Sequence, residues 1–407
     1  MRSIPTPARQ TAPARKAELD RIVEPASGEE FLAEYWERRP LVVERHEEGR
    51  FDDLLSERDV ERLVCSTGLR YPAFRVVKEG GQVPVSSYTV DVSWRPRPFS
   101  GTVNVERVVE EFANGGTIVV QALHHHWEPL ARFCRGLEDA LGHAVQANAY
   151  WTPRGSQGLA VHHDTHDVFV LQVAGDKRWL VYEPAFELPL KDQRYKRERD
   201  GEPGEPVHDL TLRAGDVLYF PRGWLHEALT SETDSLHITV GVNVYSWLDA
   251  FRAAVDSCAD DVEFRRAVPS DGELTADLAA RLAERLEPED VRGRMRRRLV
   301  RTRRPILDGQ ISQLRALDRL DLGTEVERRS TVIADLVRGD EGVALVYEGK
   351  RVSFPPQATE AVEFAFESAG PFTPADFPSD LDEPGRLVLV RRLVREGFLR
   401  LTGPARS

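Results

Sequence analysis

The chain has 407 residues, of which 41% are hydrophobic, and a formal net charge of −12. This length predicts two or three domains with cores of their own. The acidic balance argues against a protein whose main task is to coat nucleic acid, because such binding needs Lys and Arg to neutralise phosphates.

Three cysteines lie far apart, and they predict neither a disulfide framework nor a thiolate metal cluster; they are Cys65, Cys134 and Cys258. Residues 1–27 contain basic residues but no apolar segment of a secretory signal, so we expect a disordered head. No apolar run approaches the ~20 residues that cross a bilayer. These features predict a cytoplasmic protein without a membrane partner.

A helical segment is predicted ahead of the first strands. Residues 28–40 place Leu32, Tyr35 and Trp36 at helical spacing, which indicates an amphipathic helix packed on a core. One or two further short helices are expected within residues 51–70.

Residues 117–240 are rich in short β-type runs that Gly, Pro and Asp separate. The runs are TIVVQAL, LAVHHD, DVFVLQV, RWLVYEP, DVLYFP and LHITVGVNV. They predict many short antiparallel strands, and hence a barrel or a sandwich. One helix near WEPLARFCRGLEDALG interrupts them, and residues 190–206 form a charged loop.

The pattern becomes helical from Ser246 onward. Leu278, Leu282 and Leu286 repeat every four residues, as on one face of a helix. Residues 291–304 are dense in arginine. The last ~80 residues mix two or three helices with the short strands LVYEG and VSF.

Two potential metal ligands stand two residues apart in GLAVHHDTHDVFVLQV. His162 and Asp164 would point to one face of a strand, so both could reach one metal ion. The alternative is a His-rich surface strand, because His163 and His166 lie nearby. We expect those two to be non-ligands, and we expect the triplet at 124–126 to be structural.

A second motif, GDVLYFPRGWLHEA, completes the set. Gly215, Pro221, Gly223 and His226 have the spacing of the second cupin signature. The Pro-x-Gly turn would direct His226 into the barrel. Two histidines and one carboxylate form the facial triad of non-heme Fe(II) oxygenases.

Three protein ligands would leave three coordination sites on octahedral iron. Two sites would take 2-oxoglutarate and one would take O₂. Many cupins without this chemistry carry His-x-His and a later Glu, so Asp164 at the third position favours an oxygenase.

The co-substrate also needs a cation for its distal carboxylate. Lys177 begins a predicted return strand near the metal, where a buried ammonium would pair with that carboxylate; an exposed hairpin lysine is the alternative. Asn148 and Tyr150 share one strand face and would offer an amide and a hydroxyl to the co-substrate or the substrate. Alternatively, they only satisfy polar groups within the barrel.

ANAYWTPRGSQGLAVHHDTHDVFVLQVAGDKRW strongly resembles the JmjC ribosomal oxygenases, a family of 2-oxoglutarate-dependent hydroxylases. LRAGDVLYFPRGWLHEA, SLHITVGVNVYSWLDAF, VEFRRAVP and FLAEYWERRPLVVERHEEG continue the resemblance, which covers roughly residues 28–270.

The resemblance implies an α+β fold, a double-stranded β-helix (JmjC/cupin) barrel followed by a helical dimerisation region and a winged-helix domain. The expected borders are 28–247, 248–320 and 321–407. It implies iron ligands at His162, Asp164 and His226, with Lys177 on the 2-oxoglutarate carboxylate. Asn148 and Tyr150 fall on the family's polar pocket strand, and a homodimer is implied.

The implied reaction is β-carbon hydroxylation of a residue in a ribosomal protein, with succinate and CO₂ released. At the position of Gly241, histidine-hydroxylating members of the family tend to have serine, and arginine-hydroxylating bacterial members have glycine. The GSQG stretch, in contrast, resembles the histidine-hydroxylating group. The target, Arg or His, therefore stays open. Alternatives are a hydroxylase of a peptide natural product or small molecule, and a non-enzymatic cupin/winged-helix sensor.

The C-terminal domain is mildly acidic, so we expect it to act as a scaffold and not to bind DNA directly. The arginine run at 291–304 either touches rRNA or is a solvated helix face.

Overall fold

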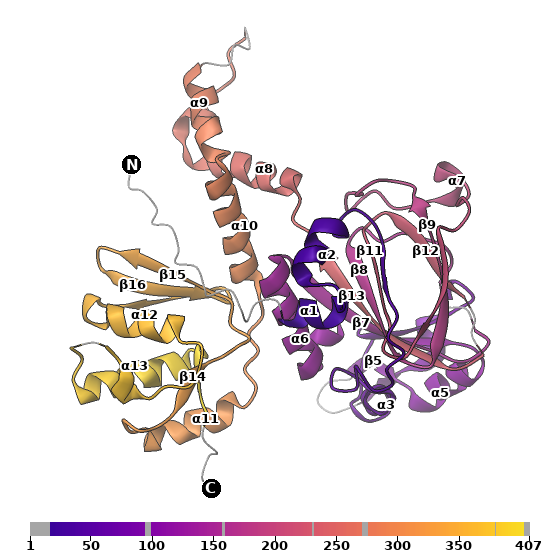
Figure 1. Cartoon of the computed structure of the whole chain (residues 1–407), viewed down its shortest axis with the longest axis horizontal. Coiled ribbons are helices and arrows are strands. Elements are labelled where there is room, and N and C mark those ends of the chain that lie inside the picture. The colour runs from indigo at the N-terminus through magenta and orange to yellow at the C-terminus, as the bar shows by residue number, and fades with distance from the viewer. Residues whose placement is uncertain are drawn as a thin grey trace. The chain divides into compact units, whose positions relative to one another are not determined.

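The computed structural model describes residues 17–93, 99–156, 159–229, 232–270, 276–378 and 380–402. These residues form two compact units (Figure 1), one ending at Val244 and the other beginning at Tyr245. The two units are considered separately below.

The amino-terminal unit begins with helices and short strands that precede and border the barrel. They are α1 Ala17–Val23, α2 Gly28–Glu34, β1 Leu41–Val43, α3 Glu57–Ser66, β2 Phe74–Lys78, β3 Gly81–Gln82, α4 Val85–Tyr88, β4 Thr89–Val92, β5 Phe99–Val103, α5 Val105–Ala113, β6 Thr117–Val120, a 3₁₀ turn Leu123–His125 and α6 Glu128–Leu141.

The prediction of a disordered head is wrong for the described part of residues 1–27. Helix α1 buries Leu19, Ile22 and Val23 completely and packs against α6. These three apolar side chains lie on one side of the short helix, and their burial stabilises it. Residues 1–16 lie outside the described residues.

The helix predicted over 28–40 is shorter than expected. Helix α2 ends at Glu34, and Glu37 adopts a left-handed conformation with φ 58°. The backbone N–H of Glu37 instead donates to the Tyr219 hydroxyl at 3.0 Å. Phe31 is fully buried, and Tyr35 and Trp36 pack against the same core.

The barrel is built from two antiparallel sheets. The larger has eight strands in the order β1-β11-β8-β13-β7-β6-β2-β3, and the smaller has the order β10-β9-β12. The remaining strands are β7 Ala144–Thr152, β8 Asp167–Ala174, β9 Asp176–Pro184, β10 His208–Arg213, β11 Val217–Phe220, β12 Trp224–Leu229 and β13 Ser235–Asn243, and a short helix, α7 Arg197–Asp200, lies between β9 and β10.

Strand β8 explains why DVFVLQV is apolar without alternation. Its odd-numbered side chains, including Phe169 and Leu171, enter the core that also holds Phe31. Its even-numbered side chains, Val168 and Val170, pack between the two sheets, against residues of β9, β10 and β11. A strand that is buried on both faces needs an apolar residue at nearly every position.

The turn before β11 is fixed by a buried carboxylate. Asp216 is fully buried and accepts hydrogen bonds from the backbone N–H groups of Arg45 at 2.7 Å, His46 at 2.9 Å and Arg213 at 2.7 Å. Gly215 has φ 91°, and a Cβ there would lie 2.5 Å from the Glu47 carbonyl oxygen. The Gly-Asp pair therefore ties the segment after β1 to the start of β11.

The carboxy-terminal unit combines helices with small sheets. It comprises α8 Trp247–Asp256, α9 Ala276–Arg285, α10 Pro288–Thr302, α11 Gln310–Ala316, β14 Val326–Arg328, β15 Ala334–Gly339, β16 Gly342–Tyr347, β17 Lys350–Phe354, α12 Thr359–Glu367, α13 Glu383–Arg395 and β18 Leu399–Leu401, with 3₁₀ turns at Ser257–Asp260, Val262–Arg265, Leu317–Arg319, Pro356–Ala358 and Pro374–Asp376.

Strands β15, β16 and β17 form one sheet, and β14 pairs with β18. The predicted helices after Ser246 and the strands LVYEG and VSF are thus present, whereas the winged-helix assignment and the domain borders stay predictions. No helix among the described residues has the length and apolar character needed to cross a membrane.

Replacing Asp216 by Ala removes the acceptor of three backbone N–H groups. Each buried donor left without a partner costs about 1–3 kcal/mol, so we expect the free energy of unfolding to fall by about 3 kcal/mol or more in urea denaturation. Asp216→Asn retains one acceptor oxygen, so its free energy of unfolding should fall by less than that of Asp216→Ala. A loss below about 1 kcal/mol in Asp216→Ala would show that the turn forms without this carboxylate.

Candidate metal centre

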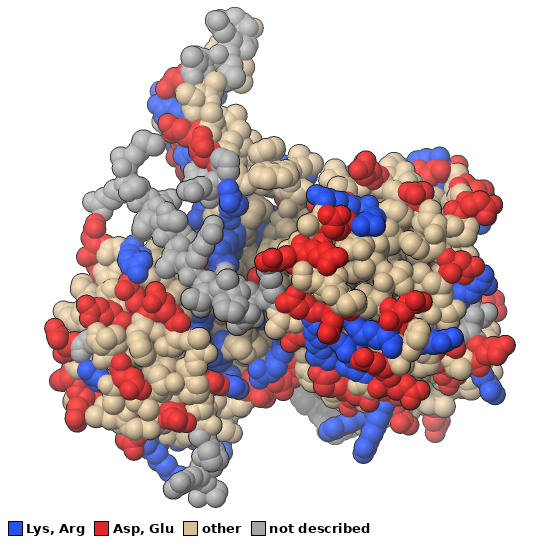
Figure 2. Space-filling view, viewed as in Figure 1, with Lys and Arg blue, Asp and Glu red and all other residues tan. Residues whose placement is uncertain are grey.

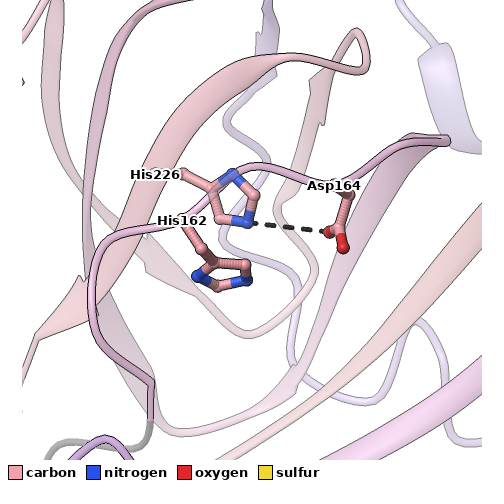
Figure 3. A group of neighbouring side chains, drawn as sticks. All are labelled: His162, Asp164 and His226. Carbon is pink, nitrogen blue, oxygen red and sulfur yellow. Dashed lines mark ion pairs between the residues drawn. The ribbon is translucent and has the colours of Figure 1, made fainter. Parts of the chain in front are cut away.

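The three predicted ligands lie close together (Figure 3). One ligand atom from each of His162, Asp164 and His226 lies within 4.8 Å of the others. The His226 Nε2 is 3.7 Å from the Asp164 Oδ2. The two imidazole rings have centroids 4.4 Å apart and are tilted by 55°. All three donor atoms are therefore close enough to share one ion.

The segment that carries two of these residues is not the strand predicted for it. Residues 159–166 pair with β12 at a single antiparallel bridge, His162 to His226. The His162 N–H donates to the His226 carbonyl at 3.1 Å, and the His226 N–H donates to the His162 carbonyl at 2.8 Å. This reciprocal pair fixes the two ligand backbones directly to each other.

The third ligand is held by the Pro-x-Gly turn. The Gly223 N–H donates to the Asp164 carbonyl at 3.0 Å. Gly223 has φ 92°, and a Cβ there would lie 2.2 Å from the Phe186 carbonyl oxygen, so only glycine fits. The Arg222 N–H donates to the buried Asp167 carboxylate at 2.8 Å. The turn thus directs His226 inward, and His226 is only 4% exposed.

Backbone carbonyls set the orientation of both imidazoles. The Nδ1 of His162 lies 2.8 Å from the Ala160 carbonyl, and the Nδ1 of His226 lies 3.0 Å from the Trp224 carbonyl. A carbonyl oxygen only accepts, so each Nδ1 carries the proton. Each Nε2 is left with its lone pair toward the centre, as a metal ligand requires.

Local electrostatics favour the ligand forms of these groups. Burial lowers the pKa of His226 to about 3, so the imidazole is neutral at physiological pH. Burial acts to raise the pKa of Asp164, but the neighbouring histidines, led by His166 and His226, outweigh it and lower the pKa. A neutral imidazole and an ionised carboxylate are the forms that bind divalent metals.

This donor set fits an iron centre of the oxygenase type. Two imidazole nitrogens and one carboxylate oxygen form the facial triad typical of non-heme Fe(II) oxygenases. All three ligands line one cavity, in which a co-substrate could also bind.

The ligands open into a cavity of about 460 Å³, which lies within the usual size range of small-molecule sites. Lys177, Tyr150 and Asn148 all line this cavity, together with apolar residues of β8, β9 and β11: Val168, Val170, Trp179 and Phe220. The structure therefore places every predicted site residue at one cavity.

Lys177 is buried and not an exposed hairpin residue. It is 1% exposed, and its Nζ donates to the Ser156 carbonyl at 3.2 Å. Burial lowers its pKa to about 8, with Asp176 acting in the opposite direction. Among the described residues no carboxylate hydrogen-bonds this ammonium, which makes it a suitable partner for an anionic ligand.

The two polar residues of β7 differ in their surroundings. The Asn148 side-chain oxygen accepts from the Ala122 N–H at 2.9 Å, so it also satisfies the local backbone. The Tyr150 hydroxyl hydrogen-bonds Arg75 and Thr239, and burial raises its pKa. Its ring stacks on His237 at 5.1 Å. Tyr150 belongs to a polar network, and Asn148 bridges the cavity wall to the backbone.

Several polar residues at the cavity were not predicted: Arg75, Thr117, Thr152, His237 and Thr239. His237 and Thr239 are two residues apart on β13, so the strand pattern alone would have placed both side chains on the same face of that strand. Arg75 lies on β2, which enters the site through long-range pairing with β6, and no local signal marks it.

The other histidines lie outside the ligand cluster. The Nε2 of His163 is 2.9 Å from the Gln193 carbonyl. His166 lies 3.2 Å from the Gln146 amide nitrogen. The His124 Nδ1 accepts from the Ala147 N–H at 3.1 Å, which agrees with a structural role.

Comparisons with known proteins show which proteins this chain resembles. The family model described as JmjC domain matches residues 122–250. The chain is 33% identical to Ribosomal oxygenase 1 of Gallus gallus over 266 residues, which cover 63% of this chain and 43% of that protein. It is 32% identical to Ribosomal oxygenase 2 of Bos taurus over 274 residues, covering 64% and 56%.

A third relative, "Bifunctional lysine-specific demethylase and histidyl-hydroxylase NO66" of Drosophila persimilis, is 33% identical over 226 residues, which cover 55% of this chain and 31% of that protein. The chain thus spans roughly a third to just over half of the length of these three curated relatives.

Among solved structures, YcfD, a ribosomal oxygenase from Escherichia coli in complex with cobalt and 2-oxoglutarate, superposes with a TM-score of 0.56. The two are 19% identical over 92% of this chain and 98% of that chain, a likeness that shows a shared fold. The α+β class and the JmjC/cupin barrel are confirmed. Residues 122–250 thus match the JmjC domain, and the chain is similar to ribosomal oxygenases 1 and 2 over 63–64% of its length.

Proposed function

We propose that this chain is an Fe(II)- and 2-oxoglutarate-dependent dioxygenase that hydroxylates an arginine or histidine side chain of a ribosomal protein. The observation that carries the proposal is the cluster of His162, Asp164 and His226 at a cavity that also contains the buried Lys177. The family match and the names of the relatives support it.

His162, Asp164 and His226 would hold the iron, which with 2-oxoglutarate and O₂ supplies the oxidation that yields hydroxylated product, succinate and CO₂. Lys177 would pair with the distal carboxylate of 2-oxoglutarate. Tyr150 and Asn148 would orient co-substrate or substrate through the hydroxyl and the amide. The apolar walls of the cavity, including Trp179 and Phe220, would exclude water from the centre.

His166 lines the cavity and lies against Gly241. A Cβ on Gly241 would lie 3.0 Å from the His166 Cε1, so any larger residue there displaces this ring. Gly241 therefore leaves room for His166 in the cavity wall, and we propose that this pair contributes to the choice between an arginine and a histidine target.

The chain would contain three regions with different roles. We propose a catalytic barrel over residues 28–247, a dimerisation region over 248–320 and a winged-helix scaffold over 321–407 that does not bind DNA directly. The three cysteines are free, as a reducing cytoplasm would keep them.

The substrate proposal is tested by mass spectrometry of ribosomal proteins from cells with and without this protein. We expect a gain of one oxygen atom on an arginine or histidine, absent in the deletion strain and restored by the wild type but not by His162→Ala. An unchanged ribosome with intact 2-oxoglutarate turnover would redirect the proposal to a peptide natural product or small molecule. Absence of turnover with full metal loading would favour a sensor.

Metal binding tests the ligand set independently of activity. Calorimetry with Mn(II), a redox-stable substitute for Fe(II), should show one site, and His226→Ala should weaken it about 100-fold or more, since even indirect supports of a metal site contribute 10–100-fold. His163→Gln is the matched control, because that ring contacts Gln193, and we expect little change. Equal losses in both variants would contradict the assignment.

The pKa of Lys177 predicts a pH dependence. The ammonium loses its proton as the pH rises through about 8, so the KM for 2-oxoglutarate should rise about tenfold between pH 7 and pH 9. Lys177→Arg keeps its charge over this range, so its KM for 2-oxoglutarate should not change between pH 7 and pH 9. A wild-type KM that stays constant, or an equal rise in Lys177→Arg, would assign the carboxylate to another group.

An exposed apolar face on α8 supports the predicted homodimer. Trp247 is 64% exposed, Phe251 44% and Val255 55%, at spacings of four residues along one side of the helix. The opposite side buries Ala250 and Ala254. A second copy would cover this face through a two-fold interface, in which the same residues meet.

Light scattering after size-exclusion chromatography tests the dimer. We expect a dimer for the wild type and a monomer for Phe251→Asp/Val255→Asp, since two charges would be buried at the interface. Val109→Asp/Val388→Asp, on two residues that are 53% and 62% exposed and lie outside the proposed dimerisation region, is the matched control and should remain dimeric. A monomeric wild type would refute the proposal.

A further inference from the structure

A basic pocket in the carboxy-terminal unit has no role in the proposed hydroxylation. It has a volume of about 330 Å³ and lies between α10 and the strands β15, β16 and β17. Five cationic side chains and one carboxylate line it: Arg296, Arg297, Arg301, Lys350, Arg351 and Asp335. Figure 2 shows Lys and Arg side chains gathered over α10, although the whole chain carries a net charge of −12.

Two of the five cations already have partners. Arg296 contacts the buried Asp335 carboxylate at 2.6 Å and anchors α10 to β15. Lys350 lies 3.5 Å from the Glu396 carboxylate and over the Tyr347 ring. The single carboxylate of the pocket is therefore occupied, and these two cations are part of the framework.

The other three cations, Arg297, Arg301 and Arg351, have no carboxylate partner among the described side chains. Arg297 and Arg301 are one turn apart on α10, on the face that begins at Gly293. A Cβ on Gly293 would lie 3.0 Å from the Arg297 Nη1, so this glycine leaves room for the guanidinium. Three like charges gathered in one concavity repel each other until an anion binds.

We infer that this pocket binds a ligand with two or more closely spaced phosphates. Planar guanidinium groups match phosphate oxygens in pairs, and a multiply charged anion balances several arginines in a small volume. Such phosphates can belong to a free oligophosphate or to the backbone of an RNA strand. The inference goes beyond the proposed function, because it concerns a different site and a different ligand.

Calorimetry on the full chain with inorganic tripolyphosphate tests the pocket. Charge-assisted hydrogen bonds are strong, so Arg297→Gln/Arg301→Gln should weaken binding at least about tenfold. Arg292→Gln/Arg315→Gln removes the same charge from exposed helix positions outside the pocket and should change affinity less than about twofold. Thermal unfolding of each variant confirms that it is folded.

A second titration with a ten-nucleotide RNA identifies the source of the phosphates. Tighter binding of the RNA, with a salt dependence that flattens in Arg297→Gln/Arg301→Gln, assigns a nucleic-acid backbone. Tighter binding of tripolyphosphate assigns a free oligophosphate. If neither probe binds the wild type, or if both double variants lose affinity equally, the inference is overturned.

Discussion

The reciprocal backbone hydrogen bonds between His162 and His226 are the constraint on which the site depends. They join a loop outside the regular sheets to β12 at one point, where both residues are proposed ligands. The Gly223 N–H then fixes Asp164 through its carbonyl. Hydrogen bonds of the main chain thereby align three side chains from two segments that are distant in sequence.

Around this centre, burial gives each polar group a defined state. Burial keeps the His226 imidazole neutral by lowering its pKa to about 3, and backbone carbonyls orient both rings. Burial also lowers the pKa of Lys177 to about 8, so this ammonium loses its proton close to physiological pH. Burial destabilises the charged form of this ammonium, so an anionic ligand bound next to it would stabilise that form.

The sequence predicts the chemistry of the site better than its local conformation. The spacing from Gly215 to His226 predicts glycines at the turns on either side of β11, and in the structure Gly215 and Gly223 both have positive φ in those turns. The strand expected at 162–164 is wrong, because its pairing is decided by one long-range bridge that no local pattern encodes. Arg75 was missed for a similar reason, and α1 because its apolar stripe is short.

The central claim is that three protein ligands leave half of an octahedral coordination sphere open. A crystal structure of the Mn(II)-loaded chain with 2-oxoglutarate, with the ion located by anomalous scattering, measures this most directly. We predict one ion bound by His162, Asp164 and His226, with the keto-acid oxygens of 2-oxoglutarate on two further sites and Lys177 at its distal carboxylate. An ion with a fourth protein ligand, or one bound away from these side chains, would contradict the account.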